Sequence, residues 1–226
     1  MNWSMVGRLL AKEWYFGRFW VGTFIGAGLL MLLVQAAFAT GSNPALRVIS
    51  IVLFYGVLNG LIWLPVPNIV MERTTQTLSF LMSLPITIRE YSAAKLLANL
   101  IVFLVPWALL GAAVIALVAS NDAFPNAYIP LIATLFVELL ALYAIVLGVA
   151  LVSESAPITQ AVGILGNIVY WFSWSFIGVA PGFGLNQDPA AVWNSPLFLM
   201  LPGCLVSVPL VLGLTVYLQS RKKDFI

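Results

Sequence analysis

The residue types that carry most enzyme chemistry are scarce in this sequence. It has no histidine and a single cysteine, Cys204, which excludes imidazole bases, histidine or cysteine metal clusters and intrachain disulfides. Glu138 is the one ionisable residue deep within an apolar run. Such a group is costly in a membrane unless it is protonated, paired or facing water, so it is a candidate functional site. It lies either beside a polar path or against a polar group of a neighbouring helix, and Tyr143 and Asn167 are candidate partners.

The composition indicates which elements must position these residues. Of the 226 residues, 62% are hydrophobic and 8% are charged, and the mean hydropathy is +1.04. Soluble domains hold about a quarter charged residues, so a water-soluble fold is excluded. Within a bilayer, a spanning segment must be a helix or part of a closed barrel, and long continuous apolar runs indicate helices. The sequence therefore predicts an all-α integral membrane protein.

Six apolar runs reach the length of about 20 residues that is needed to cross a hydrocarbon core of roughly 30 Å. The predicted spans run from Trp20 to Thr40, Val48 to Met71, Leu96 to Val118, Tyr128 to Val152, Ile158 to Val179 and Leu197 to Gln219. The intervening polar segments then alternate between the two sides of the membrane.

The distribution of basic residues sets the orientation. One side holds only Arg47, and the other holds Arg8, Lys12, Arg18, Arg73, Arg89, Lys95, Arg221, Lys222 and Lys223. Because basic residues are retained on the cytoplasmic side, both termini are predicted to be cytoplasmic. No cleavable signal peptide is predicted, since the charged start leads into a full-length span.

Residues 1–19 are predicted to form an amphipathic interfacial helix, distinct from the transmembrane domain of residues 20–226. Trp3, Val6, Leu10 and Trp14 share one helical face. Arg8 and Lys12 point roughly the opposite way. Such a helix lies in the headgroup region with its cations toward phosphate. The alternative is a simple basic flank that stops translocation of the amino terminus.

The cytoplasmic loop of residues 72–94 is the most informative segment. Leu78, Leu81 and Met82 follow helical spacing up to Pro85, which ends the helix. Thr87 and Glu90 then form a T-x-x-E capping box that begins the helix of the third span. The apolar ridge either fills a groove on a soluble partner or folds back onto the membrane interface.

The same loop resembles the signature region of ABC type-2 transporter permeases, which reads approximately E-R…T-L-x-F-L-x-S-L-P-I…R…K-L. The residues that carry the resemblance are Glu72-Arg73, Thr77-Leu78, Phe80 to Ile86, Arg89-Glu90-Tyr91 and Lys95-Leu96-Leu97. The tight match covers about 30 residues, and the amphipathic start, the six spans and the cytoplasmic ends agree with the family.

The resemblance implies the membrane subunit of a bacterial exporter in the cytoplasmic membrane, with this loop as the coupling helix. The contact with the ATPase would involve Glu72, Arg73, Leu81, Leu84, Pro85 and Arg89. No G-x-x-x-x-G-K-[ST] loop occurs in the sequence, so this chain is not expected to hydrolyse ATP. ATP and Mg²⁺ would bind two copies of a separate ATPase subunit, and a second copy of this chain would complete the membrane pathway. No nucleic-acid partner is expected.

The resemblance also implies that the second and fifth spans line the pathway. The candidate residues are Tyr55, Asn59, Trp63, Asn167, Tyr170 and Trp174, together with Glu138. The alternative for each aromatic residue is packing or interfacial anchoring. Pro65 and Pro67 predict a kink in the cytoplasmic third of the second span. The sequence that leads into the external loop of residues 180–196 is interpreted either as an aromatic belt at the membrane surface or as short re-entrant helices.

Other classes of function remain open. A secondary carrier or channel could use Glu138 for proton or cation coupling, but no inverted repeat of broken helices is evident. An intramembrane enzyme would need a catalytic constellation that the residue types do not supply. For an exporter, one acid among many aromatic residues suits a small apolar or amphipathic substrate.

Overall fold

The computed structural model describes residues 3–38, 44–70, 87–120, 128–153, 155–179 and 195–221. These residues are almost entirely helical, and no strand occurs among them. The elements are α1 (Trp3–Phe38), α2 (Pro44–Ile62), the π-helix η1 (Val66–Val70), α5 (Ile88–Ser120), α6 (Tyr128–Ser153), α7 (Ala156–Val179) and α8 (Ser195–Arg221). The predicted all-α class is thus observed throughout the described part of the chain.

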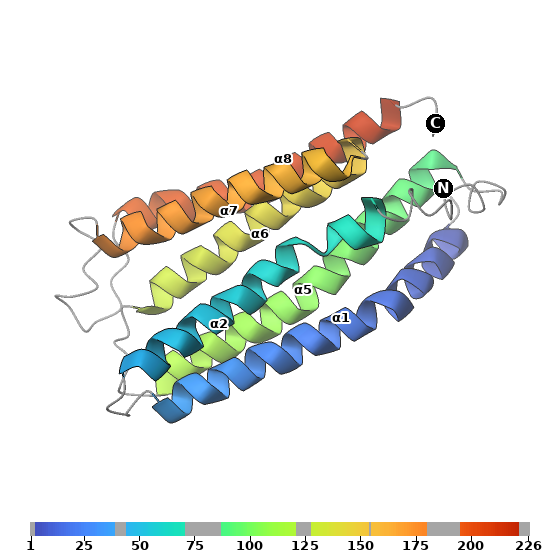
Figure 1. Cartoon of the computed structure of the whole chain (residues 1–226). Helices are drawn as coiled ribbons and strands as arrows, with labels where there is room; N and C mark the ends of the chain where they lie inside the picture. Colours follow the sequence, from blue (N-terminus) through green and yellow to red (C-terminus); the bar gives the residue numbers. More distant parts are fainter. Residues whose placement is uncertain are drawn as a thin grey trace.

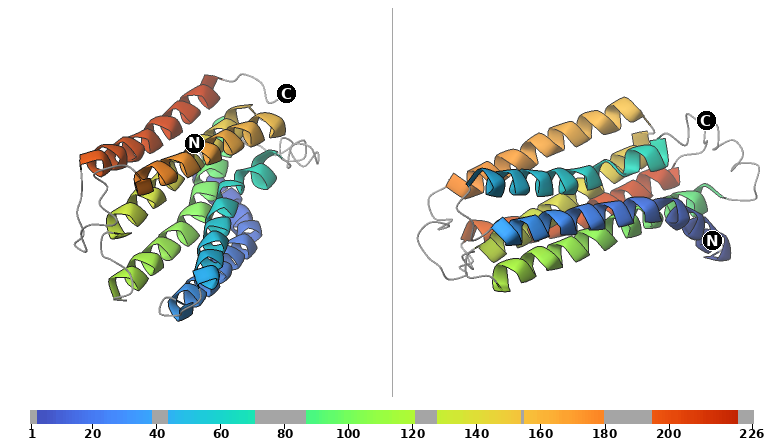
Figure 2. Two further views of the ribbon diagram at one scale, coloured as in Figure 1. Left: turned by 60° about the vertical axis from the view of Figure 1, so that its left-hand side comes forward. Right: turned by 60° about the horizontal axis from the view of Figure 1, so that its bottom comes forward.

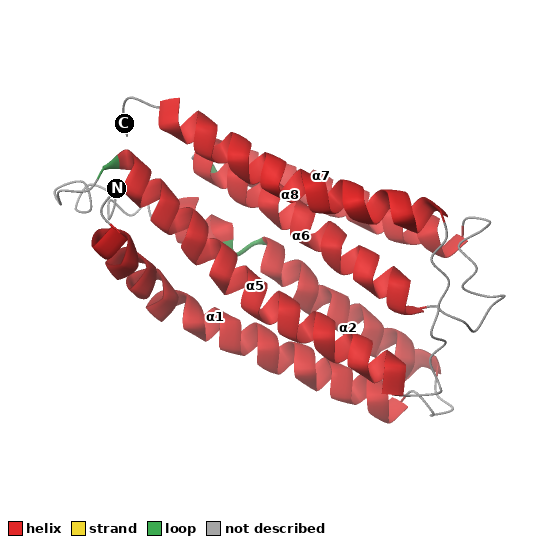
Figure 3. Ribbon diagram, turned by 180° about the vertical axis from the view of Figure 1, so that it is seen from behind, coloured by secondary structure: helices red, strands yellow, loops and turns green. Residues whose placement is uncertain are grey.

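The α-helices run up and down along one bundle, with α6 at its centre (Figure 1). On one side of α6 lie α1, α2 and α5, and on the other lie α7 and α8. Two further views and the view from behind show the same arrangement (Figures 2 and 3). α6 packs against α5, α7 and α8, and α1 packs along α5. Leu139, Tyr143 and Leu147 of α6 are fully buried, so this helix forms the core of the bundle.

Four helices in the described part of the chain are long and apolar enough to cross a membrane: Trp3–Ala37, Glu90–Ser120, Tyr128–Ser153 and Met200–Arg221. Their outward faces carry large apolar side chains such as Phe19 and Leu33, which are 71% and 68% exposed. Water would penalise these surfaces and lipid would not. These helices therefore indicate a helical membrane protein. The count of six spans stays a prediction, because the described apolar helix in α2 is the shorter segment Val52–Ile62.

α1 is one continuous helix, without a break at residue 19 between an interfacial helix and a span. Its 36 residues extend about 54 Å, far beyond a hydrocarbon core of roughly 30 Å. Close packing on α5 holds its first half: a Cβ at Gly17 would lie 2.6 Å from Val102 Cγ2. Val6 is buried, whereas Trp3 and Trp14 are exposed. The face that was expected to lie in the headgroup region is thus partly buried within the protein and partly exposed.

The predicted kink in the second span is confirmed. α2 ends at Ile62, a turn follows at Trp63 and Leu64, and the chain rewinds as η1. Pro65 and Pro67 have no backbone N–H to donate, and the amide of Val66 donates to the carbonyl of Trp63 at 3.1 Å. Short π-helical segments of this kind often occur at functional sites.

The start of α1 and the end of α8 lie at the same end of the bundle, where α5 begins (Figure 1). We call this the charged end, because Arg8, Lys12, Lys95 and Arg221 lie toward it. That the charged end is cytoplasmic stays a prediction from the distribution of basic residues.

Candidate functional site

Polar side chains of α2 and α7 meet between these two helices. Tyr55, Asn59 and Trp63 follow one another at intervals of four residues, which places them on one helical face. The Asn59 side-chain amide donates to the carbonyl of Tyr55 at 3.2 Å. Its oxygen accepts a hydrogen bond from the amide of Asn167 on α7. This pair of asparagines is the polar link between the two helices.

Aromatic rings extend the contact on both sides of the asparagine pair. The ring centroids of Tyr55 and Trp171 lie 5.6 Å apart, and those of Trp171 and Tyr170 lie 6.4 Å apart. Toward the charged end, the Trp63 ring covers Gly163 so closely that a Cβ there would lie 3.0 Å from it. Gly163, Asn167 and Trp171 recur every four residues along α7. One face of α2 therefore meets one face of α7.

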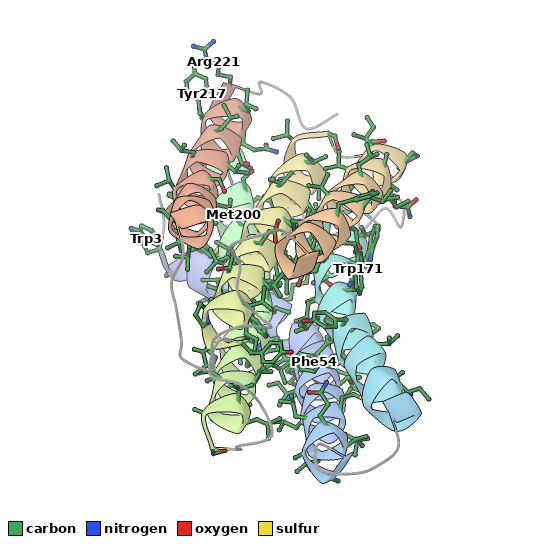
Figure 4. The ribbon with its side chains drawn as sticks, turned by 90° about the vertical axis from the view of Figure 1, so that its left-hand side faces the viewer. Trp3, Phe54, Trp171, Met200, Tyr217 and Arg221 are labelled. Carbon is green, nitrogen blue, oxygen red and sulfur yellow. The ribbon has the colours of Figure 1, made fainter. Side chains whose placement is uncertain are left out.

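Long side chains, rather than close backbone packing, make this contact. The main helix neighbour of α7 is α6, and that of α2 is α1. In the view along the bundle, Trp171 lies between α7 and α2 (Figure 4). Tyr55, Asn59, Trp63 and Asn167 are all partly buried. The region between the two helices is consequently lined by amide and aromatic groups. Its shape can change without disturbing a tight backbone interface.

Glu138 of α6 lies behind this region, on the side of α6 that faces α7. It interacts with the hydroxyl of Ser173 and with Tyr170. One turn farther along α6, Leu142 packs on Gly166 of α7. The Glu138 Oε2 atom is buried and has no hydrogen-bond partner among the described residues. The residues of α7 thus provide hydrogen-bond partners for only part of the Glu138 carboxyl group.

The expectation that Tyr143 or Asn167 would pair with Glu138 was wrong. Tyr143 lies five residues after Glu138, about 140° around the helix, and its hydroxyl donates to the carbonyl of Asn99 at 2.7 Å. Its ring stacks on Phe103 at 3.8 Å. The Asn167 amide is taken by Asn59. Ser173, which sequence reasoning did not single out, lies near the acid instead.

Six of the seven residues predicted for the pathway therefore gather around one region: Tyr55, Asn59, Trp63, Glu138, Asn167 and Tyr170. The region offers amide donors and acceptors, a carboxyl group and aromatic faces in an apolar frame. These groups can bind the polar part of an amphipathic molecule while its apolar part contacts the rings. Among the described residues, no group of three or more acidic or cysteine side chains could hold a metal ion.

A second polar cluster lies nearer the charged end and was missed from the sequence. Lys95 of α5, only 3% exposed in its side chain, forms an ion pair with Glu13 of α1 at 2.8 Å. Its ammonium also donates to the carbonyl of Asn68 in η1 at 3.0 Å. The Asn68 amide in turn donates to the side-chain oxygen of Asn99 at 3.1 Å, and Asn99 accepts from Tyr143. One connected network thus joins α1, η1, α5 and α6.

The predicted ATPase contact falls mostly outside the described residues. Glu72, Arg73, Leu81, Leu84 and Pro85 lie there, as does most of the external loop 180–196. Arg89 belongs to α5, but its side chain and that of Trp174 are not described.

The capping box that follows the loop is confirmed. The amide of Thr87 donates to the Glu90 carboxylate at 3.1 Å, and the amide of Glu90 donates to the Thr87 hydroxyl at 3.3 Å. The C-terminal part of the loop thus joins α5 through a capped helix start.

No protein-family model, curated protein or solved structure matches this chain. The resemblance to ABC type-2 permeases therefore stays a prediction that depends on residues 72–97.

Proposed function

We propose that the chain is the membrane-spanning permease subunit of an ATP-binding cassette exporter. Two copies would work with two separate ATPase subunits, which bind ATP and Mg²⁺, to move a small amphipathic or apolar substrate across the bacterial cytoplasmic membrane. The observation that carries the proposal is the gathering of six predicted pathway residues from α2, α6 and α7 around one region. Its amide, carboxyl and aromatic groups suit the binding of an amphipathic substrate.

The two flanks of the signature loop support the same proposal. Before the loop, Asn68 is bound by Lys95 and Asn99. After the loop, Thr87 and Glu90 cap α5. A force applied to the loop would therefore reach η1 and α5 directly, and through Lys95 it would reach Glu13 of α1. Because η1 is joined to α2 through the turn at Trp63 and Leu64, the same movement would change the region between α2 and α7.

An exposed apolar face of α7 supports a dimer. Beyond its polar stripe, α7 carries Leu165, Val169 and Phe172, whose side chains are 63%, 64% and 72% exposed. A second copy of the chain could cover part of this apolar face and close a pathway around Tyr55 and Asn59.

Copurification tests the proposal. A tagged chain is coexpressed with an ATP-binding cassette protein encoded beside it, and the complex is isolated in detergent. Leu81→Asp and Arg89→Glu are expected to abolish capture of the ATPase while the chain elutes normally from size-exclusion chromatography. Lys222→Glu, a charge reversal on the same predicted side, serves as the control and retains the ATPase. Failure of the wild-type chain to capture any neighbouring ATPase would contradict the proposal.

The unpartnered oxygen of Glu138 favours a second candidate, a secondary carrier or channel that uses this acid for proton or cation coupling. Liposomes that contain only this chain separate the two. Ion flux that Glu138→Gln abolishes, without any ATPase, would support the carrier. Absence of such flux, with ATP-dependent transport in the reconstituted complex, would support the permease.

A further inference from the structure

A cavity of about 510 Å³ lies between α5, α6 and α8 at the charged end of the bundle. Ser92 and Leu96 of α5, Leu151 of α6, and Val216, Gln219 and Ser220 of α8 line it. Because α6 and its neighbours α5 and α8 form its walls, the cavity lies apart from the contact between α2 and α7. Its volume falls within the range of ligand-binding pockets, roughly 300–1,000 Å³.

Uneven packing of α8 creates the cavity. α8 is held tightly against α6, where a Cβ at Gly148 would lie 2.5 Å from the Thr215 hydroxyl oxygen. Near the end of α8, the Gln219 side-chain amide donates to the carbonyl of Leu151. The packing of α8 on α5 is much less extensive. A space is therefore left between α5 and α8 at the charged end, with α6 at its back.

The lining is mixed at the charged end and mostly apolar one turn farther into the bundle, where the Thr215 hydroxyl donates to the Val211 carbonyl within α8. Ser92 and Ser220 lie nearest the helix ends at the charged end, and Leu96 and Val216 lie one turn farther into the bundle. Val216 is 56% exposed although it lines the cavity, so the cavity opens onto the apolar outer surface of α8. A molecule in the cavity would have its polar part at the membrane surface and its apolar part inside.

A cation lies one residue beyond the lining residue Ser220, at the end of α8. Arg221 follows Ser220, is exposed, and its guanidinium lies 4.6 Å from the centre of the Tyr217 ring. In the view along the bundle, Tyr217 and Arg221 project together from the end of α8 (Figure 4). Lys222 and Lys223 follow in the sequence. Basic pockets between transmembrane helices at the cytoplasmic surface bind anionic lipid headgroups.

We propose that this cavity binds one anionic phospholipid of the leaflet at the charged end. One acyl chain would fill the apolar part between Leu96 and Val216, and the phosphate would lie at the mouth, near Ser92, Ser220 and Arg221. A helix of a partner protein does not fit, because a helix with its side chains is about 10–12 Å wide and the cavity has the volume of a small ligand. The proposal does not depend on the exporter function.

Native mass spectrometry tests the site. The full chain is purified in detergent and mixed with equal amounts of phosphatidylglycerol and phosphatidylcholine that have identical acyl chains. The expected result is retention of one phosphatidylglycerol in preference to phosphatidylcholine. Val216→Trp fills the cavity and should lower retention at least tenfold. Val206→Trp is the matched control, because Val206 is also 56% exposed on α8 but does not line the cavity.

Arg221→Gln tests the headgroup contact and should reduce the preference for phosphatidylglycerol about fivefold, the effect of one basic residue near an anionic surface. Arg18→Gln is its control, because Arg18 also stacks on a neighbouring tyrosine ring, at 4.1 Å from Tyr15. Equal retention of the two lipids by the wild type would overturn the proposal. So would full retention by Val216→Trp, or the binding of detergent alone.

A wild-type experiment covers the case in which Val216→Trp fails to fold. Phosphatidylglycerol with a photoreactive group in its acyl chain is bound and illuminated, and the labelled peptides are identified. Labels on the segments that contain Leu96 and Val216 are expected. Labels confined to other lipid-facing segments, such as the one that contains Leu33, would overturn the proposal.

Discussion

Lys95 of α5 and Glu13 of α1 form an ion pair across 82 residues of sequence, with 2.8 Å between the ammonium nitrogen and the carboxylate oxygen. The side chains are only 3% and 11% exposed. Removing one partner of a buried pair leaves an uncompensated charge. The pair therefore holds the first half of α1 against the helix that follows the signature loop.

We expect Glu13→Gln to lower the free energy of unfolding by roughly 3–5 kcal/mol, because Lys95 would stay buried without its counter-ion. Denaturation in mixed detergent micelles measures the change. Lys12→Met is the control: Lys12 lies 3.5 Å from the same carboxylate but is 37% exposed, and exposed pairs contribute about 0–1 kcal/mol. The double variant Glu13→Gln/Lys95→Met should recover much of the loss. Additive losses would contradict this view of the pair.

Thr87→Val should weaken the start of α5. The variant keeps the side-chain shape but removes the hydroxyl oxygen that accepts a hydrogen bond from the Glu90 amide. Loss of such a cap typically lowers the free energy of unfolding by about 1 kcal/mol. Hydrogen exchange should accelerate in the first turn of α5 and stay unchanged in α6. Thr23→Val, whose hydroxyl donates to a carbonyl of its own helix at an exposed site, provides the control. Unchanged exchange near Thr87 would argue against the cap.

Gly163→Val should push the Trp63 ring away from α7. A Cβ at position 163 would already lie 3.0 Å from this ring, and overpacking of this kind costs typically about 1–3 kcal/mol. Gly213→Val in α8 meets nothing within 4 Å and should be nearly neutral. The thermal midpoint in detergent gives the comparison. Trp63→Leu should partly rescue Gly163→Val, and absence of rescue would mean that another neighbour is displaced.

Asn59 and Asn167 should show coupled effects in a double-mutant cycle. Their side-chain hydrogen bond joins α2 to α7, and such bonds within membrane proteins average about 0.6 kcal/mol, with a maximum near 1.7. The free energies of unfolding of Asn59→Ala, Asn167→Ala and the double variant provide the coupling energy. Asn59→Ala with Ser207→Ala, a serine that bonds within α8, is the uncoupled control. A coupling energy of zero would contradict a stabilising hydrogen bond between Asn59 and Asn167.

Glu138→Leu should increase stability and abolish transport. Its Oε2 atom is buried without a partner among the described residues, and an unmatched polar group costs roughly 1–3 kcal/mol in proteins. The variant should therefore be more stable by a similar amount, while transport by the reconstituted complex falls at least tenfold. Ser173→Ala separates the two roles, because it alters the hydroxyl beside the acid and keeps the carboxylate. A less stable Glu138→Leu would indicate a structural acid.

The helices could be predicted from the sequence because the bilayer demands long apolar runs. The run from Tyr128 to Val152 corresponds to α6, Tyr128–Ser153, and the run from Ile158 to Val179 corresponds to α7, Ala156–Val179. Pro65 and Pro67 marked the break after α2, and Thr87 with Glu90 marked the start of α5. These features depend on backbone hydrogen bonding among residues that are close in sequence.

The sequence by itself thus determined the all-helical class, most helix ends and the candidate residues of the α2–α7 contact. Only the tertiary structure decided which polar groups satisfy one another. It placed Ser173 beside Glu138, paired Lys95 with Glu13, and opened the cavity between α5 and α8. Helical periodicity predicts which face a residue occupies. The rotation and divergence of packed helices, which depend on interlocking contacts such as those at Gly148 and Gly163, decide what that face meets.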